Sequence, residues 1–254
     1  MNAQDTSWEN VASWYDSLVG EKGGYFHTHV IFPKLIPLLS LKPGMNVLDI
    51  ASGQGAFTRL LGQKGYTVTG VDRSESLVAK ARNYNNENVT YLVDDARSLK
   101  ALGKQKFDRI TCILALQNID PIDECFKRIH ELLVNGGRCV VVLMHPAFRA
   151  PRISGWEIDE EKKLMSRRVD RYLTPMKVPI AMHPGKESSD VTWTFHRPLS
   201  EYARFARQAH LYIDSMEEWT SDKVSIGKNA DMENFARTEI PLFLAIRMKR
   251  IDHA

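Results

Sequence analysis

Long hydrophobic runs are missing from this 254-residue sequence. No apolar stretch approaches the roughly 20 residues that a helix needs to cross a bilayer, so we expect no transmembrane segment and a cytoplasmic protein. Neither sign of charge dominates, because 34 lysine and arginine residues face 31 aspartate and glutamate residues, for a net charge of +3. Such a small excess argues against a protein built mainly to bind nucleic acid.

Cysteine is scarce as well, with only Cys112, Cys125 and Cys139. Their spacing matches no zinc motif, so we expect no metal site built from cysteine pairs. Two of them fall in apolar segments typical of buried strands, and cysteine used as a small core residue indicates a reducing compartment. What the sequence does contain is 43% hydrophobic and 26% charged residues, ordinary values for one globular domain with a full core.

The segment from Asn46 to Gly55, which reads N-V-L-D-I-A-S-G-Q-G, is the most informative stretch. It begins as a short apolar run that predicts a buried parallel strand. Small residues then let the backbone turn tightly and approach a ligand closely, namely Ala51, Ser52, Gly53 and Gly55. A helical pattern starts at Ala56. A strand, a glycine loop and a helix N-terminus in this order predict a site for a nucleotide-like ligand.

Two acidic residues narrow the choice of ligand. Asp72 ends the next expected strand, about 20 residues beyond the loop, where a carboxylate meets ribose hydroxyls in NAD sites and in S-adenosylmethionine (SAM) sites alike. Asp49 lies just before the loop, where it would repel a pyrophosphate but attract the ammonium group of methionine. Thr58 also occupies a position at which the dinucleotide fingerprint has Gly or Ala. These residues favour SAM over NAD, and the remaining alternative is a purely structural glycine turn.

The sequences V-L-D-I-A-S-G-Q-G, G-V-D-R-S and D-D-A together resemble the class I, Rossmann-like SAM-dependent methyltransferases. The nearer likeness is to the small-molecule branch that includes ubiquinone and menaquinone methyltransferases, and it covers about residues 40–145 well. Two positions depart from the family pattern. Ala51 replaces the usual first glycine of the loop, and Arg73 replaces the apolar residue that packs on adenine. The guanidinium of Arg73 can stack on the base instead.

The resemblance implies further contacts with the cofactor. Asp95 would accept a hydrogen bond from the adenine amino group, the Ala96 backbone would meet the adenine ring, and the backbone near Leu114 would meet the methionine amino group. The loop 117–121 would line the acceptor pocket. It lacks the N-P-P-Y type motif of methyltransferases that act on DNA bases or glutamine, which argues against those substrates.

The N-terminal segment, residues 1–41, would fold over bound SAM in the family that this sequence resembles. Tyr15, Tyr25 and His27 are therefore candidate contacts of the cofactor or the acceptor. The alternative is that the aromatic residues among them pack the N-terminal helices onto the rest of the domain.

The apolar patterns and the resemblance predict one domain of the α/β class, with a doubly wound, seven-stranded, mostly parallel sheet and an antiparallel last strand. The expected strands are 45–50, 67–72, 89–93, 107–116, 138–144, 212–219 and 241–248. Helices are expected at 8–18, 30–41, 122–133 and 199–211 and after the first two strands, and residues 221–239 are expected to be a polar loop.

Residues 145–197 form an insertion after the fifth strand, which we interpret as a lid over the acceptor. A helix is expected from Glu157, because Ile158, Met165, Val169 and Tyr172 are spaced for one helical face. A β-hairpin is expected at 176–195, around a turn at His183-Pro-Gly185. Basic and aromatic residues are interleaved in this insertion, so RNA stays open as an alternative acceptor.

We therefore expect methyl transfer from SAM to a small-molecule acceptor, at an O, N, S or C atom that the sequence does not define. His27, His145 and His196 are the candidate bases for a phenol or enol acceptor, and a structural role is the alternative for each. No metal cluster is expected to activate the acceptor. The alternatives from other classes are an RNA-modifying methyltransferase and a SAM-binding regulator without turnover.

Overall fold

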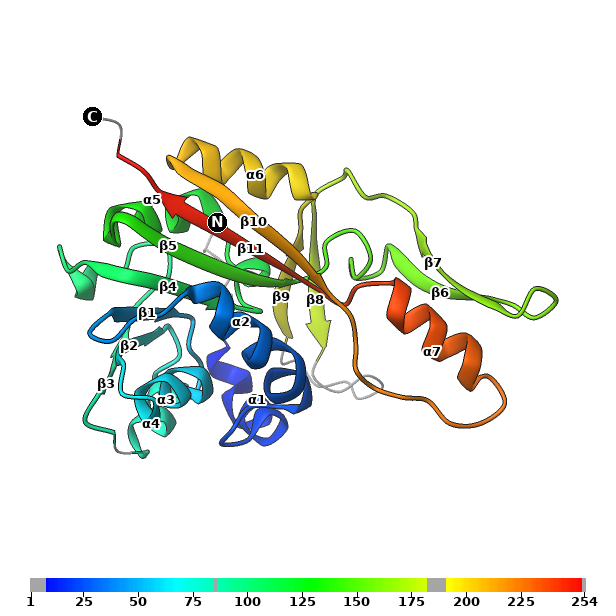
Figure 1. Ribbon diagram of the computed structural model, residues 1–254, viewed down its shortest axis with the longest axis horizontal. Helices are drawn as coiled ribbons and strands as arrows, with labels where there is room; N and C mark the ends of the chain where they lie inside the picture. The colour runs from blue at the N-terminus through cyan, green and yellow to red at the C-terminus, as the bar shows by residue number, and fades with distance from the viewer. Residues whose placement is uncertain (1–7, 85, 182–190, 253–254) are drawn as a thin grey trace.

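The computed structural model describes residues 8–84, 86–181 and 191–252, and a seven-stranded sheet forms its centre. The strands are β1 (Asn46–Ile50), β2 (Thr67–Asp72), β3 (Val89–Val93), β4 (Phe107–Ile113), β5 (Leu133–Met144), β10 (Leu211–Trp219) and β11 (Phe243–Arg250). Their order across the sheet is β10-β11-β5-β4-β1-β2-β3 (Figure 1). Strands β1 to β5 are parallel, and β11 pairs antiparallel with both β5 and β10. The predicted sheet, with its antiparallel last strand, is confirmed.

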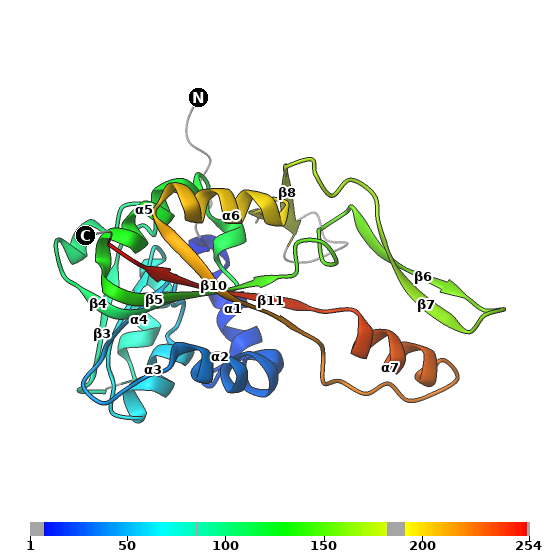
Figure 2. The ribbon, with the colours of Figure 1, turned by 45° about the horizontal axis from the view of Figure 1, so that its top comes forward.

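Helices cover both faces of this sheet. They are α1 (Ala12–Val19), α2 (Phe32–Leu39), α3 (Ala56–Gln63), α4 (Glu75–Arg82), α5 (Ile122–Leu132), α6 (Leu199–Gln208) and α7 (Ala230–Glu239), with short helical turns at Glu9–Val11, His27–Ile31, Lys100–Leu102 and Leu116–Asn118. In Figure 2, α5 and α6 lie on one side of the sheet and α2 and α3 on the other. None of the helices in the described part of the chain is long and apolar enough to cross a membrane.

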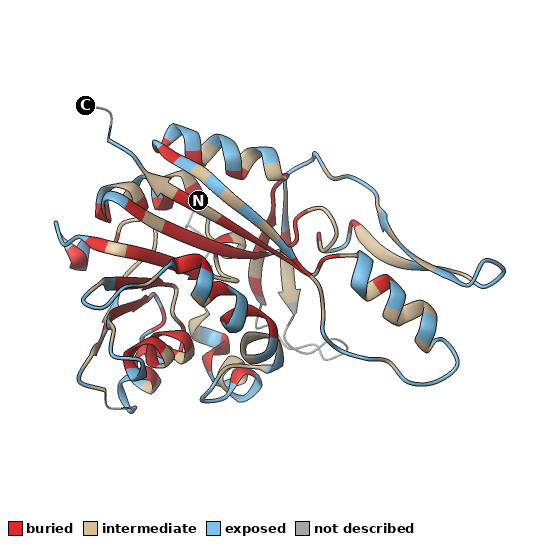
Figure 3. Cartoon of the chain, viewed as in Figure 1, coloured by how far each residue is buried: buried red, intermediate tan, exposed pale blue. Residues whose placement is uncertain are grey.

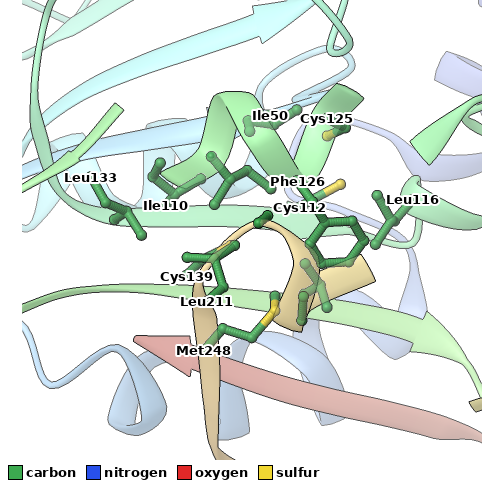
Figure 4. Close-up of a cluster of buried hydrophobic side chains, with 14 of the residues drawn as sticks. Ile50, Ile110, Cys112, Leu116, Cys125, Phe126, Leu133, Cys139, Leu211 and Met248 are labelled. Carbon is green, nitrogen blue, oxygen red and sulfur yellow. The ribbon is translucent and has the colours of Figure 1, made fainter. Parts of the chain in front are cut away.

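The core explains why the central strands read as apolar runs. Along β5, Cys139, Val141 and Leu143 pack in a cluster with α5 and α6, whereas Val140 and Val142 pack in a second cluster with α2 and α3. Figure 4 shows the first of these clusters, and Figure 3 shows that the central strands are mostly buried. A parallel strand covered by helices on both faces has no polar face, so its sequence does not alternate.

The first part of the insertion after β5 differs from prediction. The helix expected from Glu157 is wrong: β6 (Ser154–Asp159) and β7 (Leu164–Val169) form an antiparallel hairpin. Ile158 and Met165, which suggested one helical face, lie opposite each other across this hairpin. Along β7 the side chains alternate between exposed and half-buried, so the true period is two residues.

Helix α7 lies inside the segment that was expected to be a polar loop, so that prediction is also wrong. Ala236 is its only buried residue, which explains why no apolar period marks it. Two of its three acidic residues, Asp231 and Glu233, lie in the first turn and Arg237 lies in the last, where each interacts favourably with the helix dipole. Helix α7 and the β6–β7 hairpin extend together away from the sheet, and we call these three elements the wing (Figures 1 and 2).

The second part of the insertion folds as predicted. Strands β8 (Met176–Ala181) and β9 (Val191–His196) pair antiparallel as a hairpin. The turn expected at His183-Pro-Gly185 lies outside the described residues. Residues 145–152, together with this hairpin, stand beside the carboxyl ends of the parallel strands and thereby help to form the site.

Candidate functional site

A cavity of about 590 Å³ opens at the carboxyl ends of the parallel strands. Ligands of open α/β sheets collect at this edge, and small-molecule sites usually fall between about 300 and 1,000 Å³. The segments that follow the parallel strands contribute to its wall, together with the N-terminal segment, residues 145–152 and the β8–β9 hairpin. The lining residues that sequence analysis had singled out are Tyr15, His27, Ala51, Gly53, Asp72, Arg73, Asp95, Ala96, Leu114 and His196.

The glycine loop follows β1 as predicted, but its residues have different roles. Ala51 and Gly53, at φ angles of 54° and 57°, line the cavity. Gly55 does not line it: a Cβ on Gly55 would clash with the hydroxyl of Tyr91, so this glycine makes room for Tyr91 rather than for a ligand. Ser52 also lies outside the large cavity, and its hydroxyl is buried without a hydrogen-bond partner among the described residues.

Asp72 ends β2 and faces the cavity. Its carboxylate accepts hydrogen bonds from the backbone N–H groups of Gly53 (2.8 Å) and Ser74 (2.9 Å), so it also fixes the glycine loop. Burial raises the pKa of Asp72 and outweighs the lowering effect of its backbone hydrogen bonds with Ser74, Gly53 and Arg73. An ionised carboxylate has about four acceptor positions, so Asp72 can still accept from a ligand hydroxyl.

Asp49 is placed differently from Asp72. It is buried at the end of β1 and accepts hydrogen bonds from the hydroxyls of Thr58 (2.7 Å) and Thr111 (2.8 Å). Burial raises its pKa from 3.8 to about 6. Asp49 does not line the large cavity but borders a smaller one of about 30 Å³, together with Tyr15 and Ala51. Its predicted contact with an ammonium group would therefore be made through this smaller space.

Asp95 and its neighbours lie where β3 ends. The Asp95 carboxylate accepts from Arg97, with 2.6 Å to Nη2, and lies 3.8 Å from the Nε of Arg73. Burial acts to raise the pKa of Asp95, but the hydrogen bonds and charge of Arg97 outweigh it, and the pKa is lowered. The carboxylate is therefore ionised at neutral pH and can accept further bonds. Ala96 lies beside it in the cavity wall.

Leu114, after β4, has a φ of 53°, which turns its backbone at the edge of the cavity. Its N–H donates to the carbonyl of Val142 (2.7 Å) and its carbonyl accepts from the side-chain amide of Gln117 (2.8 Å). The other amide atom of Gln117, Oε1, is buried without a partner among the described residues. Gln117 lines the cavity, so this oxygen is an acceptor that a ligand could satisfy.

The N-terminal segment lies over the glycine loop. A Cβ on Gly53 would meet the ring of Tyr15 at 3.3 Å, and Trp8 packs edge-on against that ring at 5.2 Å between centroids. Burial raises the pKa of Tyr15 to about 12, and the nearby Asp72 and Asp49 carboxylates raise it in the same direction. The phenol of Tyr15 is therefore a neutral hydrogen-bonding group at the edge of the cavity.

Polar contacts hold this segment in place. The carboxylate of Glu9 accepts hydrogen bonds from the hydroxyls of Ser74 and Ser76 at the start of α4, and Asp16 pairs with Lys80 at 2.7 Å. Negative charge at a helix N-terminus is favourable, which adds to the stability of the Glu9 contact. The chain thereby brings Trp8 and Tyr15 onto the cavity from a distant part of the sequence.

Tyr25, the third aromatic candidate, lies away from the cavity. It is 43% exposed, its ring stacks on His29 with 4.2 Å between centroids, and its hydroxyl donates to Asp222 at 3.2 Å. Of the two readings left open for Tyr25, this placement agrees with packing rather than with ligand contact.

The three candidate histidines are also placed differently. His27 and His196 line the cavity, and His145 does not. Both ring nitrogens of His145 are engaged, Nε2 with Glu218 at 2.8 Å and Nδ1 with the N–H of Ala147 at 3.2 Å. Burial lowers the pKa of His27, so its imidazole is neutral at pH 7 and able to accept a proton.

His196 differs from His27 in having a backbone partner. Its Nε2 lies 2.7 Å from the carbonyl oxygen of Tyr172, so Nε2 carries the hydrogen and donates it. The other ring nitrogen, Nδ1, is then the acceptor of the neutral ring.

Several cavity residues were not singled out from the sequence. Arg149 and Arg152 line it from the segment after β5, while Val178, Ile180 and Phe195 line it from the β8–β9 hairpin. The run H-P-A-F-R-A-P-R at 145–152 held a usable signal, because it places two arginines directly after a parallel strand at the ligand-binding edge. In the described residues, no three His, Cys, Asp or Glu side chains gather as a metal site would require.

Comparison with known proteins gives consistent matches. The family model of a methyltransferase domain matches residues 48–141. A ubiquinone biosynthesis O-methyltransferase of Coxiella burnetii is 33% identical over 110 residues, 42% of this chain and 47% of that protein. A 2-phytyl-1,4-naphtoquinone methyltransferase of Thermosynechococcus vestitus is 29% identical over 192 residues, 73% of this chain and 78% of that protein.

The crystal structure of a SAM-dependent methyltransferase from Mesorhizobium loti superimposes with a TM-score of 0.66 at 26% identity, covering 86% of this chain and 97% of that one. Sequence likeness is thus strongest around the glycine loop and the parallel strands, and the structural likeness extends over most of the fold. The chain spans about half the length of the Coxiella relative, 47%.

Proposed function

Since this chain belongs to the class I, Rossmann-like SAM-dependent methyltransferases, we propose that it is an enzyme that transfers the methyl group of SAM to a small-molecule acceptor. The observation that carries this proposal is the continuity of the cavity. One end is walled by the glycine loop, Asp72 and Asp95, and the other by residues 145–152 and the β8–β9 hairpin. A cofactor and an acceptor would therefore share one continuous cavity.

The residues at the first end fit the cofactor. Gly53 leaves the loop without a side chain beneath Tyr15, Asp72 can still accept from a ribose hydroxyl, and Gln117 has an unpartnered buried oxygen in the wall. We assign ribose binding to Asp72, adenine binding to Asp95, Ala96 and Arg73, and methionine binding to Asp49 and the backbone of Leu114. SAM supplies a methyl group already activated by a sulfonium, so the protein mainly has to bind, align and exclude water.

The cavity also contains groups that hold or move a proton. Neutral His27 lies in the cavity and can accept a proton from a phenol or enol as the acceptor attacks. His196, with Nε2 donating to Tyr172, would present Nδ1 as an acceptor or orient the acceptor. We give His145 a structural role, because Glu218 and the backbone already engage both of its nitrogens.

A small molecule is the better-supported acceptor. The two relatives above are named for reactions of quinone biosynthesis, and the net charge of +3 offers little attraction to RNA. We also propose that the protein works in the cytoplasm, because its three cysteines are all buried free thiols, as a reducing compartment allows.

The ribose contact of Asp72 gives the first test. Each charge-assisted hydrogen bond contributes about 1.5–3 kcal/mol, so Asp72→Ala should weaken SAM binding by about a hundredfold or more. Asp123→Ala is the matched control, because Asp123 pairs with Lys127 on the exposed side of α5 and should leave binding unchanged. Calorimetric titration of both variants with SAM, S-adenosylhomocysteine and NAD measures the dissociation constants. Circular dichroism checks that the variants are folded.

Two outcomes would count against the proposal. Heat of binding with NAD and none with SAM would reject the cofactor, and an unchanged dissociation constant in Asp72→Ala would remove Asp72 from the site. Transfer of tritium from labelled SAM to fractions of a cell extract then tests turnover. Tight SAM binding with no labelled product in any fraction would indicate a binding protein without turnover.

A further inference from the structure

The acceptor end of the cavity contains an arginine without an acidic partner. The guanidinium of Arg149 makes no hydrogen bond or ion pair with the described part of the chain, and its Nε is buried. It lies over the ring of Trp156 at 5.0 Å from the centroid, and Arg149 lines the cavity. The chain thus holds a cation at the cavity wall by packing alone.

The surroundings of Arg149 disfavour the charged form of its guanidinium. Arg167 lies over the same Trp156 ring, at 5.1 Å, so a second cation stands nearby. Burial, together with the nearby charge of Arg167, lowers the pKa of Arg149 from 12.5 to about 10. Arg149 therefore stays charged at neutral pH in a place that favours the neutral form. A partly buried cation of this kind is stabilised when an anion reaches it.

Of the other arginines of the cavity, Arg152 is exposed to solvent, whereas Arg73, Arg97 and Arg197 have carboxylate partners. Arg197 donates from Nη2 to Asp120 (2.5 Å) and to the carbonyl of Ile119 (3.0 Å). Arg97 and Arg73 both lie against Asp95. Arg149 differs from these three because the described chain supplies it with no carboxylate, so its counter-charge has to come from a ligand.

Apolar side chains also contribute to this wall. Val178, Ile180 and Phe195 from the β8–β9 hairpin line it, with Met144 at the end of β5. Such a surface favours a ligand with a hydrophobic body and few polar groups. A ligand that matches both the wall and Arg149 has an apolar scaffold with one negatively charged group.

We propose that the methyl acceptor is an apolar small molecule carrying an anionic group, a carboxylate or a phosphate, and that Arg149 binds this group. The proposal rests on the function proposed above and adds the substrate class. The planar guanidinium pairs with either anion through two parallel hydrogen bonds, which would fix the orientation of the acceptor as well as its affinity.

The test compares charged and uncharged probes of one shape. With S-adenosylhomocysteine present at saturation, 2-naphthoate, 2-naphthyl phosphate and uncharged 2-naphthamide are titrated into the protein by calorimetry. We expect an anion to bind at least about tenfold more tightly than the amide, the effect of one charge-assisted hydrogen bond. The anion that binds more tightly tells a carboxylate acceptor from a phosphate acceptor.

Variants assign the effect to Arg149. Arg149→Gln should abolish the preference for the anions and leave the affinity for the amide unchanged, while Arg149→Lys should keep part of the preference. Arg167→Gln is the matched control, because Arg167 contacts the same Trp156 but does not line the cavity, and it should keep the preference. The melting temperature of Arg149→Gln should not fall, because the change removes a partly buried, unpartnered cation.

The outcomes separate this inference from the proposed function. Equal binding of anions and amide to the unaltered protein, or a preference that survives Arg149→Gln, would overturn the role of Arg149. If S-adenosylhomocysteine binds as expected in that case, the proposed function still stands. If it fails to bind, the proposed function fails, and titrations repeated without it still decide whether Arg149 selects anions.

Discussion

Asp49 is a carboxylic acid whose partners in the described chain are two hydroxyls. It is 2% exposed, and the hydroxyls of Thr58 and Thr111 donate to its two oxygens. Burial outweighs these bonds and raises its pKa to about 6. An unfolded aspartate has a pKa near 3.8. Between about pH 3.8 and pH 6, Asp49 is therefore protonated in the folded protein and ionised in the unfolded chain. Above pH 6 this residue therefore lowers stability, and the effect fades as the pH falls toward 3.8.

Asp49→Asn should accordingly stabilise the protein without cofactor. One pKa unit corresponds to about 1.4 kcal/mol, so we expect the free energy of unfolding at pH 7.5 to rise by roughly 1–3 kcal/mol. The gain should be smaller at pH 5, where Asp49 of the unaltered protein is mostly protonated in the folded state. Urea unfolding at the two pH values measures the difference.

The same variant tests the assigned contact with methionine. Loss of the carboxylate charge should weaken SAM binding if the ammonium group lies against Asp49. Thr69→Val, a change in the neighbouring strand β2, is a control for general effects on the core. An Asp49→Asn protein that is less stable at pH 7.5 would show that the charge of Asp49 is better compensated than its surroundings indicate.

At the residue scale, the sequence predicted the strand-end positions well. The glycine loop and Asp72 lie in or around the cavity because the carboxyl ends of parallel strands meet at one edge of the sheet. A residue that directly follows such a strand in the sequence is therefore expected at that edge. Side-chain direction was not predictable in this way. Asp49 turns toward two threonines and His145 toward Glu218, partners contributed by distant segments. The position of Arg149 directly after a parallel strand can be read from the sequence, whereas its lack of an acidic partner is a property of the folded chain.

At the scale of elements, the insertion after β5 separates into two hairpins with different surroundings. The β8–β9 hairpin contributes Val178, Ile180 and Phe195 to the cavity. The β6–β7 hairpin belongs to the wing, which extends away from the sheet (Figures 1 and 2). If the insertion acts as a lid over the acceptor, as we propose, the β8–β9 hairpin and residues 145–152 form the part that covers it.

Shortening each hairpin tests this division. Replacing residues 179–193 by Asn-Gly would join Val178 and Thr194, which face each other in the hairpin, by a two-residue turn. We expect SAM affinity within about twofold of normal and turnover reduced by about a hundredfold or more, because the acceptor loses its alignment and its shield from water.

The matched control replaces residues 158–165 of the wing by the same two residues, between the paired Glu157 and Ser166. Both SAM affinity and turnover should then stay near normal. A loss of SAM binding in the first variant, with the fold intact, would place the β8–β9 hairpin in the cofactor site. Normal turnover in that variant would end the proposal of a lid.

Buried helices and strands were easier to predict from the sequence than exposed ones. Strands and helices of the central sheet have long apolar patterns, since both faces of the sheet are covered. The wing has no such pattern: Ile158 and Leu164 are exposed in its hairpin, and α7 buries only Ala236. Sparse apolar residues on an exposed hairpin can fit a helical period by chance, which is how the segment from Glu157 was misread.

At the scale of the whole molecule, the sheet depends on β11. This strand joins β5 to β10, and its side chains alternate between the two hydrophobic clusters, with Leu244, Ile246 and Met248 in one and Phe243 and Ala245 in the other. A substitution in β11 should therefore affect the stability of the entire fold, whereas the adjacent β10 has one exposed face.

Ile246→Ala should lower the free energy of unfolding by about 2–5 kcal/mol, the usual cost of such a cavity in a core. Ile246 is 1% exposed. Its cross-strand neighbour Met216, on β10, is 43% exposed, so Met216→Ala should change stability by less than about 1 kcal/mol. Urea unfolding of the two variants makes the comparison, and equal losses would contradict the central role of β11.

The position of β11 also has a consequence for biosynthesis. A chain leaves the ribosome from its N-terminus at about 5–20 residues per second, so β5 emerges on the order of ten seconds before β11. During that interval the edge of β5 that later pairs with β11, including Val140 to Leu143, has no neighbouring strand. Unpaired apolar edges are where nascent chains aggregate. We therefore expect the growing chain to be prone to aggregation until β11 emerges and completes the sheet.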